Sequence, residues 1–379
     1  MTHRERVEAS VHFSEPDRIP IDMWGTDSRL LDDFYFKVVD HLKLAEGGEL
    51  ERPGKTAQYV DYRLSDCFGC DFRHLVAKRP VGFEPRQDEE GNQYDEWGVG
   101  YRKVGAHSFI SKHPFPEPDI FAIKRHDWPD MSDSSRAEGL SQQAYRWFEE
   151  TDFAISTTTP VSGLVMDIYQ YLRGSDNFFT DLLLEERFAH TLIEKIANLV
   201  EELYENLVTP VASYLTWVEF ASDYGTQHGP FISPELYRKF LKTPERQIFR
   251  KIKKIAPEAK IFMHSCGSVR RLIPDLIDAG VEILSSLQPL AYEMDSFGLK
   301  RDFGRELVFH GGVDMQVAMV GSKERVIEET KRRIEAFASG GGYIGGPSNH
   351  FTGDIPVENF FAMYETFLEC GTYSARRAR

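Results

Sequence analysis

The second half of the chain alternates short apolar runs with longer amphipathic segments. Between the short runs, apolar positions recur at helical spacing, most clearly over residues 186–208. Strands that alternate with helices usually pair in parallel, so the pattern predicts an α/β fold. Apolar runs with the length of buried strands occupy residues 153–158, 214–220, 260–264, 281–287, 307–312 and 342–346.

The N-terminal third follows a different pattern. Alternating apolar positions over 19–23 predict a first strand, and residues 28–43 have the spacing of an amphipathic helix. Residues 58–130 are rich in aromatic residues, glycine and proline, and alternation around 94–101 predicts a β-hairpin insertion there. Seven to eight strands close a barrel, so we predict a (β/α)8 TIM barrel with an N-terminal helical and β-hairpin insertion, as one domain over 1–379.

Composition narrows the classes of function. The chain has 379 residues, 41% of them hydrophobic, and a formal net charge of -15. An acidic surface disfavours a nucleic-acid partner, and no apolar run is long enough to predict a membrane span. The first residues are charged and lead to no signal-peptide core, and four cysteines indicate no disulfide framework. We therefore expect a cytoplasmic protein that works on a small molecule.

The strand ends carry the candidate chemistry, because a barrel gathers the carboxyl ends of its strands at one face. His264 and Cys266 follow a buried run two residues apart, and imidazole plus thiolate is a ligand pair suited to zinc. A zinc site needs further ligands from other loops, and His350 with Asp223 or Glu219 are the candidates. The alternative is a buried His and Cys that only pack.

A glycine-rich segment surrounds the last predicted strand. It lacks the Gly-Lys-Ser/Thr of a phosphate-binding P-loop, but such glycines let a planar cofactor approach the backbone closely. We predict cofactor contacts at Gly341, Gly342 and Gly345, with Asn349 in the loop that comes next. A tight turn is the alternative.

Motifs along nearly the whole chain resemble the uroporphyrinogen decarboxylase superfamily, in the order in which that superfamily carries them. The resemblance implies a (β/α)8 barrel. The segments that carry it are Arg4–Arg6 with Glu15–Pro20, Ser222–Gln227, Gly229–Glu235, His264–Ser268, Ile273–Val281, Gly311–Asp314, Gly341–Ile344 and Ile355–Asn359.

Two details bear on the branch of that superfamily. The His264-x-Cys266 motif is similar to the zinc motif of the corrinoid-dependent methyltransferases, whose third thiolate lies in the glycine-rich loop. Residues 347–350 hold no Cys, so His350 is the candidate replacement. Residues 21–26 lack the arginines with which the decarboxylase branch binds the substrate's carboxylates.

The resemblance therefore implies zinc-dependent methyl transfer. The methyl group would move between a small methyl donor, of methoxy or methylamine type, and a corrinoid carried by a partner protein. We predict Asp223, His264 and Asp22 as catalytic residues and a possible homodimer. One alternative is a tetrapyrrole decarboxylase in which Asp22 holds pyrrole N–H groups, and another is a non-catalytic binder of a tetrapyrrole or corrinoid.

Overall fold

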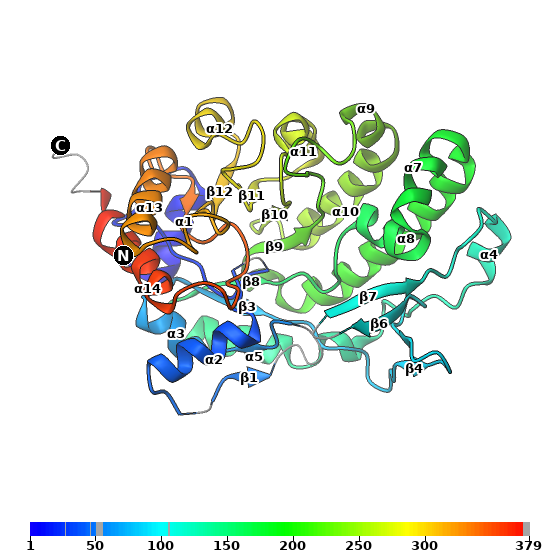
Figure 1. Cartoon of the computed structure of the whole chain (residues 1–379), viewed down its shortest axis with the longest axis horizontal. Helices are drawn as coiled ribbons and strands as arrows, with labels where there is room; N and C mark the ends of the chain where they lie inside the picture. The colour runs from blue at the N-terminus through cyan, green and yellow to red at the C-terminus, as the bar shows by residue number, and fades with distance from the viewer. Residues whose placement is uncertain (27, 46, 51–55, 105–106, 374–379) are drawn as a thin grey trace.

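The computed structural model describes residues 1–26, 28–45, 47–50, 56–104 and 107–373 (Figure 1). Its centre is a parallel sheet with the strand order β13-β12-β11-β10-β9-β8-β3. Each predicted strand of the second half is present, and the sheet curls into a barrel. The strands are β3 (Phe72–Leu75), β8 (Ala154–Thr157), β9 (Leu215–Ala221), β10 (Lys260–His264), β11 (Ile283–Ser285), β12 (Val308–His310) and β13 (Tyr343–Ile344).

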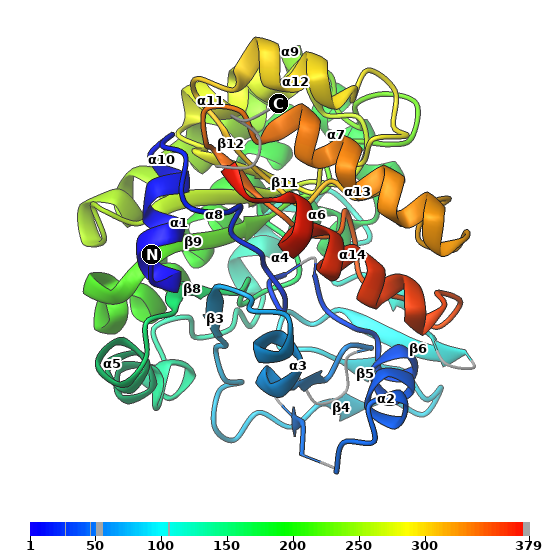
Figure 2. The same ribbon diagram turned by 90° about the vertical axis from the view of Figure 1, so that its left-hand side faces the viewer.

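Helices surround this sheet, as Figures 1 and 2 show. α8 covers the range that its apolar spacing predicts. Between β9 and β10, α9, a π-helical turn at Tyr237–Leu241 and α10 follow one another directly. The surrounding helices are α5 (Leu140–Glu150), α6 (Val165–Arg173), α7 (Ser175–Leu184), α8 (Glu186–Val208), α9 (Pro234–Leu236), α10 (Lys242–Ile255), α11 (Ile273–Ala279), α12 (Ser296–Phe303), α13 (Lys323–Phe337) and α14 (Val357–Cys370).

The predicted first strand closes the barrel without forming a full ladder. Ile21 makes one parallel bridge to Gly345, beyond the end of β13. Gly345 N donates to Pro20 O at 2.8 Å, and Asp22 N donates to Gly345 O at 3.0 Å. On the other side, Asp71 N, just before β3, donates to Ile21 O at 2.9 Å. These bonds join the two ends of the sheet, so the prediction of a TIM barrel is confirmed.

The N-terminal end of the barrel is closed by α1 (His3–Val11) and by buried charge pairs. Arg6 Nη1 and Arg18 Nη1 donate to the two oxygens of the buried Asp71 carboxylate, each at 2.8 Å. Arg6 and Arg18, which belong to the N-terminal motif, therefore stabilise the fold by pairing with Asp71. α1 contributes to an apolar layer inside the barrel that comprises Val7, Val11, Phe72, Ala154, Trp217, Phe262, Ile283, Val308 and Ile344.

The remaining elements lie outside the barrel sheet. β3 falls inside the range that the sequence assigns to an insertion, so the part outside the barrel is narrower than 58–130. It includes an antiparallel sheet in the order β4-β5-β6-β7. Among all the described helices, none is long and apolar enough to cross a membrane. These elements are α2 (Asp32–His41), β1 (Glu49–Leu50), β2 (Tyr59–Val60), α3 (Tyr62–Cys67), β4 (Arg86–Gln87), β5 (Gln93–Tyr94), β6 (Gly100–Val104), β7 (His107–Lys112) and α4 (Ile120–Arg125).

Candidate functional site

A group of three potential metal ligands lies at the carboxyl ends of β9 and β10. His264 ends β10, Cys266 comes two residues later, and Asp223 comes two residues after the end of β9. Their ligand atoms all lie within 4.8 Å of one another. Cys266 Sγ is 3.4 Å from His264 Nε2, and His264 Nε2 is 3.7 Å from Asp223 Oδ1. We call these residues the Asp223–His264–Cys266 group.

Two glycines bring the loops of this group into contact. A Cβ atom on Gly225 would lie 2.6 Å from both Cys266 O and Ser268 N. Gly267 has a φ of +76°, and its own Cβ would lie 2.5 Å from Gly225. A side chain at either position would separate the backbones, so the approach of Asp223 to Cys266 requires glycine on both loops.

Hydrogen bonds orient the group. Asp223 Oδ1 accepts from Cys266 N at 3.0 Å, which fixes the carboxylate over the second loop. Gln288, after β11, accepts from Gly267 N at 2.8 Å. Asn349 Nδ2 lies 3.6 Å from Cys266 Sγ and donates to the sulfur. Asn349 therefore contacts the group directly, in the role of a hydrogen-bond donor.

The donor set fits zinc. Zinc takes thiolate sulfur at about 2.3 Å and imidazole nitrogen at about 2.0–2.1 Å, so tetrahedral ligands lie about 3.4–3.6 Å apart. The sulfur–nitrogen and nitrogen–oxygen separations of 3.4 and 3.7 Å are close to this spacing. The side chain of Asp223 is 58% exposed and that of His264 only 12%, so the group opens to solvent on the Asp223 side.

Two residues predicted as ligands lie outside the group. Glu219 is buried in β9, where its carboxylate accepts from Thr26 N at 3.0 Å and from Trp217 Nε1 at 3.2 Å. These contacts hold it within the barrel, before the loop that carries Asp223. His350 comes directly after Asn349, and its backbone N–H donates to the Asn349 side chain.

Asp22 lies at the centre of a buried hydrogen-bond chain across the barrel. Its Oδ1 contacts His74 Nε2 at 2.8 Å and its Oδ2 contacts His310 Nε2 at 2.9 Å. The outer ring nitrogens contact Ser156 Oγ at 2.6 Å and Ser285 Oγ at 3.0 Å. We call this the Asp22 chain; all five residues are buried.

Charge pairing dominates the Asp22 chain. Burial by itself raises the pKa of Asp22, but His74 and His310 hold it well below the ordinary value. Burial lowers the pKa of His74, but the Asp22 and Glu219 carboxylates together hold that pKa above the ordinary value. The pair thus favours a carboxylate beside an imidazolium.

The structure divides the predicted cofactor residues between the two ends of the barrel. Gly341 and Gly342 precede β13 and so lie at the N-terminal end, where their Cβ atoms would meet Ser14 and Phe13. Gly345 holds the barrel closed. Gly345 follows β13 and therefore lies toward the open end, as does Asn349, and of these four predicted residues Asn349 is the one that contacts the Asp223–His264–Cys266 group.

Sequence reasoning missed two buried acids behind the Asp223 loop. Asp167 accepts from Ser222 Oγ at 2.6 Å, and burial raises the pKa of Asp167 to about 6. Glu245 accepts from Tyr224 Oη at 2.6 Å, and burial raises the pKa of Glu245 to about 8. Asp167 lies in the first turn of α6 and Glu245 in the first turn of α10. An acidic residue near the start of a helix was the only signal in the sequence that pointed to them.

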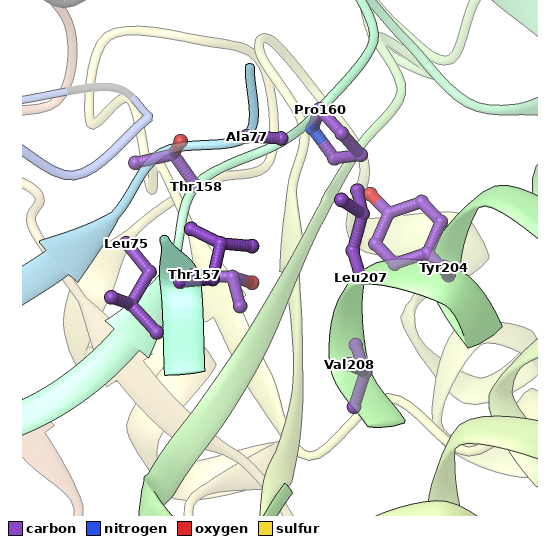
Figure 3. A pocket seen from close by; sticks show the side chains of 9 residues that line it. Leu75, Ala77, Thr157, Thr158, Pro160, Tyr204, Leu207 and Val208 are labelled. Carbon is purple, nitrogen blue, oxygen red and sulfur yellow. The ribbon is translucent and has the colours of Figure 1, made fainter. Parts of the chain in front are cut away.

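A small cavity near the barrel does not add to the site. Figure 3 shows it between Leu75, Thr157, Tyr204 and Leu207, with a volume of about 10 Å³. This volume admits a single water at most, and the lining is mostly apolar. The cavity is a packing gap between β3, β8 and α8.

Comparisons with known proteins agree with this fold. The family model described as uroporphyrinogen decarboxylase (URO-D) matches residues 135–369. A methyltransferase from Methanosarcina mazei has a similar structure, with a TM-score of 0.65 and 15% identity over 97% of this chain and 99% of that one. Xylanase 10B from Thermotoga maritima, with a TM-score of 0.39 and 12% identity over 62% of this chain and 79% of that one, is too distant to guide interpretation. A comparison with curated proteins gives no match.

Proposed function

The chain belongs to the uroporphyrinogen decarboxylase family, and we propose that within this family it is a zinc-dependent methyltransferase. It would move a methyl group between a small methylated substrate, of methoxy or methylamine type, and a corrinoid carried by a partner protein. The observation that carries the proposal is the convergence of Asp223, His264 and Cys266 at the open end of the barrel.

Each residue of the group has a separate role in this proposal. Asp223, His264 and Cys266 would hold zinc, which acts as a Lewis acid on the substrate heteroatom when bound. Asn349 donates to the sulfur of Cys266 and so would help to orient that ligand. The exposed side of Asp223 leaves room for a small substrate.

The likeness to a solved methyltransferase supports the same branch, at the level of the fold. A decarboxylase of the kind that gives the family its description is the second candidate. In that case Asp22 would bind the substrate's pyrrole N–H groups, but both of its carboxylate oxygens already accept from buried imidazoles. This arrangement favours the methyltransferase.

The test combines metal analysis with methyl transfer. We expect about one zinc per chain in the purified protein, and loss of both zinc and turnover in His264→Ala and Cys266→Ser. Cys67→Ser, at an exposed cysteine far from the group in sequence, is the matched control and retains both. Turnover is measured by the cobalt absorbance of a methylated corrinoid protein.

Four results would contradict the proposal. A protein without metal, or a His264→Ala variant with full turnover, removes the role of the Asp223–His264–Cys266 group. Decarboxylation of uroporphyrinogen by the metal-free protein establishes the second candidate. Tight binding of a corrinoid without any turnover, unchanged in His264→Ala, identifies a non-catalytic binder.

A further inference from the structure

A second concave surface lies at the opposite end of the barrel from the Asp223–His264–Cys266 group. Its volume is about 400 Å³. It is formed by residues at and just after the end of α12, by Ser339 and Gly340 before β13, and by Phe13, which follows α1. In a chain with a net charge of -15, its lining has three cationic side chains and no acidic one. We call it the Lys300 cavity, and its lining residues are Phe13, Lys300, Arg301, Gly304, Arg305, Ser339 and Gly340.

Lys300 is the partly buried cation of this cavity. Its Nζ donates to Gly341 O at 2.7 Å, which uses one of the three ammonium donors. Its stem packs over Gly304, where a Cβ atom would lie 2.6 Å from Lys300 Cδ. Burial lowers the pKa of Lys300 to about 8, with no carboxylate acting against the shift. The structure thus holds an ammonium in place without an opposite charge.

The two arginines of the cavity differ in their ion pairing. Arg305 makes no hydrogen bond or ion pair with any described residue and is exposed. Arg301 Nε and Nη2 donate to the two carboxylate oxygens of Asp302, at 2.7 and 3.1 Å, and Asp302 also pairs with Arg270. One carboxylate is therefore shared between two guanidinium groups. An anion in the cavity would add negative charge beside Lys300 and Arg305, which have no ion-pair partner among the described residues.

We propose that the Lys300 cavity binds a small phosphate group, either as inorganic phosphate or as a phosphate monoester. A phosphate carries about −1.5 to −2 charges near neutral pH and three acceptor oxygens, which suits one ammonium and two guanidinium groups. Guanidinium forks match phosphate oxygens in a bidentate manner, and the ammonium adds a point charge. The site lies at the opposite end of the barrel from the Asp223–His264–Cys266 group, so phosphate binding there is separate from the proposed methyl transfer.

Calorimetric titration of the full-length protein with inorganic phosphate tests the proposal. At constant ionic strength we expect saturable binding with one phosphate per chain. Lys300→Gln and Arg305→Gln should each weaken the affinity about tenfold or more, since each removes a charge-assisted hydrogen bond. Lys254→Gln, at an exposed lysine on α10, is the matched control and leaves the affinity unchanged.

The two variants protect the test against a folding artefact. Arg305 contacts no described residue through a polar bond, so its loss cannot disturb the fold in that way. Unchanged affinity in both variants, absence of saturable binding, or equally tight binding of acetate would overturn the proposal. A titration with glycerol phosphate assigns the source: affinity equal to that of phosphate indicates a monoester ligand, and weaker affinity indicates the free ion.

Discussion

Replacing Glu245 with glutamine should remove a large part of the pH dependence of stability. Glu245 is fully buried in α10 and accepts from Tyr224 Oη at 2.6 Å and from Tyr237 Oη at 2.9 Å. Burial raises its pKa from 4.5 to about 8. The folded state therefore keeps a proton that the unfolded chain releases above its own pKa, and stability falls as pH rises toward the folded pKa.

The size of the effect is set by that pKa. One proton difference between the folded and unfolded states changes stability by about 1.4 kcal/mol per pH unit. Between about pH 6 and pH 8, with a folded pKa of about 8, Glu245 should cost the protein about 2 kcal/mol of unfolding free energy. Glutamine has the shape of the protonated acid and does not titrate, so Glu245→Gln should lose this slope.

Urea unfolding of the wild type and the variant at several pH values measures the slope directly. Glu258→Gln, at an exposed position after α10, serves as the control and keeps the wild-type slope. Because Asp167 interacts with Glu245 through charge, the difference between variant and wild type is the quantity to compare. Equal slopes in the wild type and in Glu245→Gln would refute the reasoning.

Two further changes test the loop contact and the base of the barrel. Gly225→Ala should abolish metal binding with little loss of helical circular dichroism, because its Cβ would lie 2.6 Å from the backbone of the Cys266 loop. Gly229→Ala, where a Cβ would meet nothing within 4 Å, should keep its metal, and a metal-loaded Gly225→Ala protein would contradict the idea. Asp71→Asn should lower the urea-unfolding free energy by about 3–5 kcal/mol, since it leaves two arginines without their shared carboxylate. A loss below about 1 kcal/mol would show that water already compensates those charges.

The second half of the fold was predictable because each element carries its own periodic signal. α8 has apolar residues at helical spacing throughout, and β10 is a short apolar run that ends at a glycine-containing turn. The segment over residues 19–23 has the alternation of a strand, yet within the described part of the chain it makes a single bridge, from Ile21 to Gly345. Its neighbours in the barrel come from distant parts of the chain, so local periodicity could not reveal that it closes the sheet.

The candidate site was predictable only for residues whose end of the barrel is decided by the direction of the neighbouring strand. His264, Cys266 and Asp223 lie at or just after the ends of strands, and parallel strands bring their carboxyl ends to one face of the barrel. Gly341 and Gly342 precede β13, and residues before a strand lie at the opposite end of the barrel from residues after it. Strand direction therefore separates these two glycines from the site. Asp167 and Glu245 lie on helices, where their burial depends on packing that spacing alone does not determine.

The Asp22 chain connects the closure of the barrel with the choice between the two candidate functions. The closing segment around Asp22 has few backbone bonds, and its carboxylate bridges His74 on β3 to His310 on β12, which lie toward the two ends of the sheet. A decarboxylase that used Asp22 to bind pyrrole N–H groups would have to break one or both of these bonds. Each is charge-assisted and worth about 1.5–3 kcal/mol, so that use of Asp22 would weaken the closure of the barrel. The proposed methyltransferase would require no such change, because its candidate zinc ligands lie at and beyond the strand ends, and Asp22 would keep both hydrogen bonds during turnover.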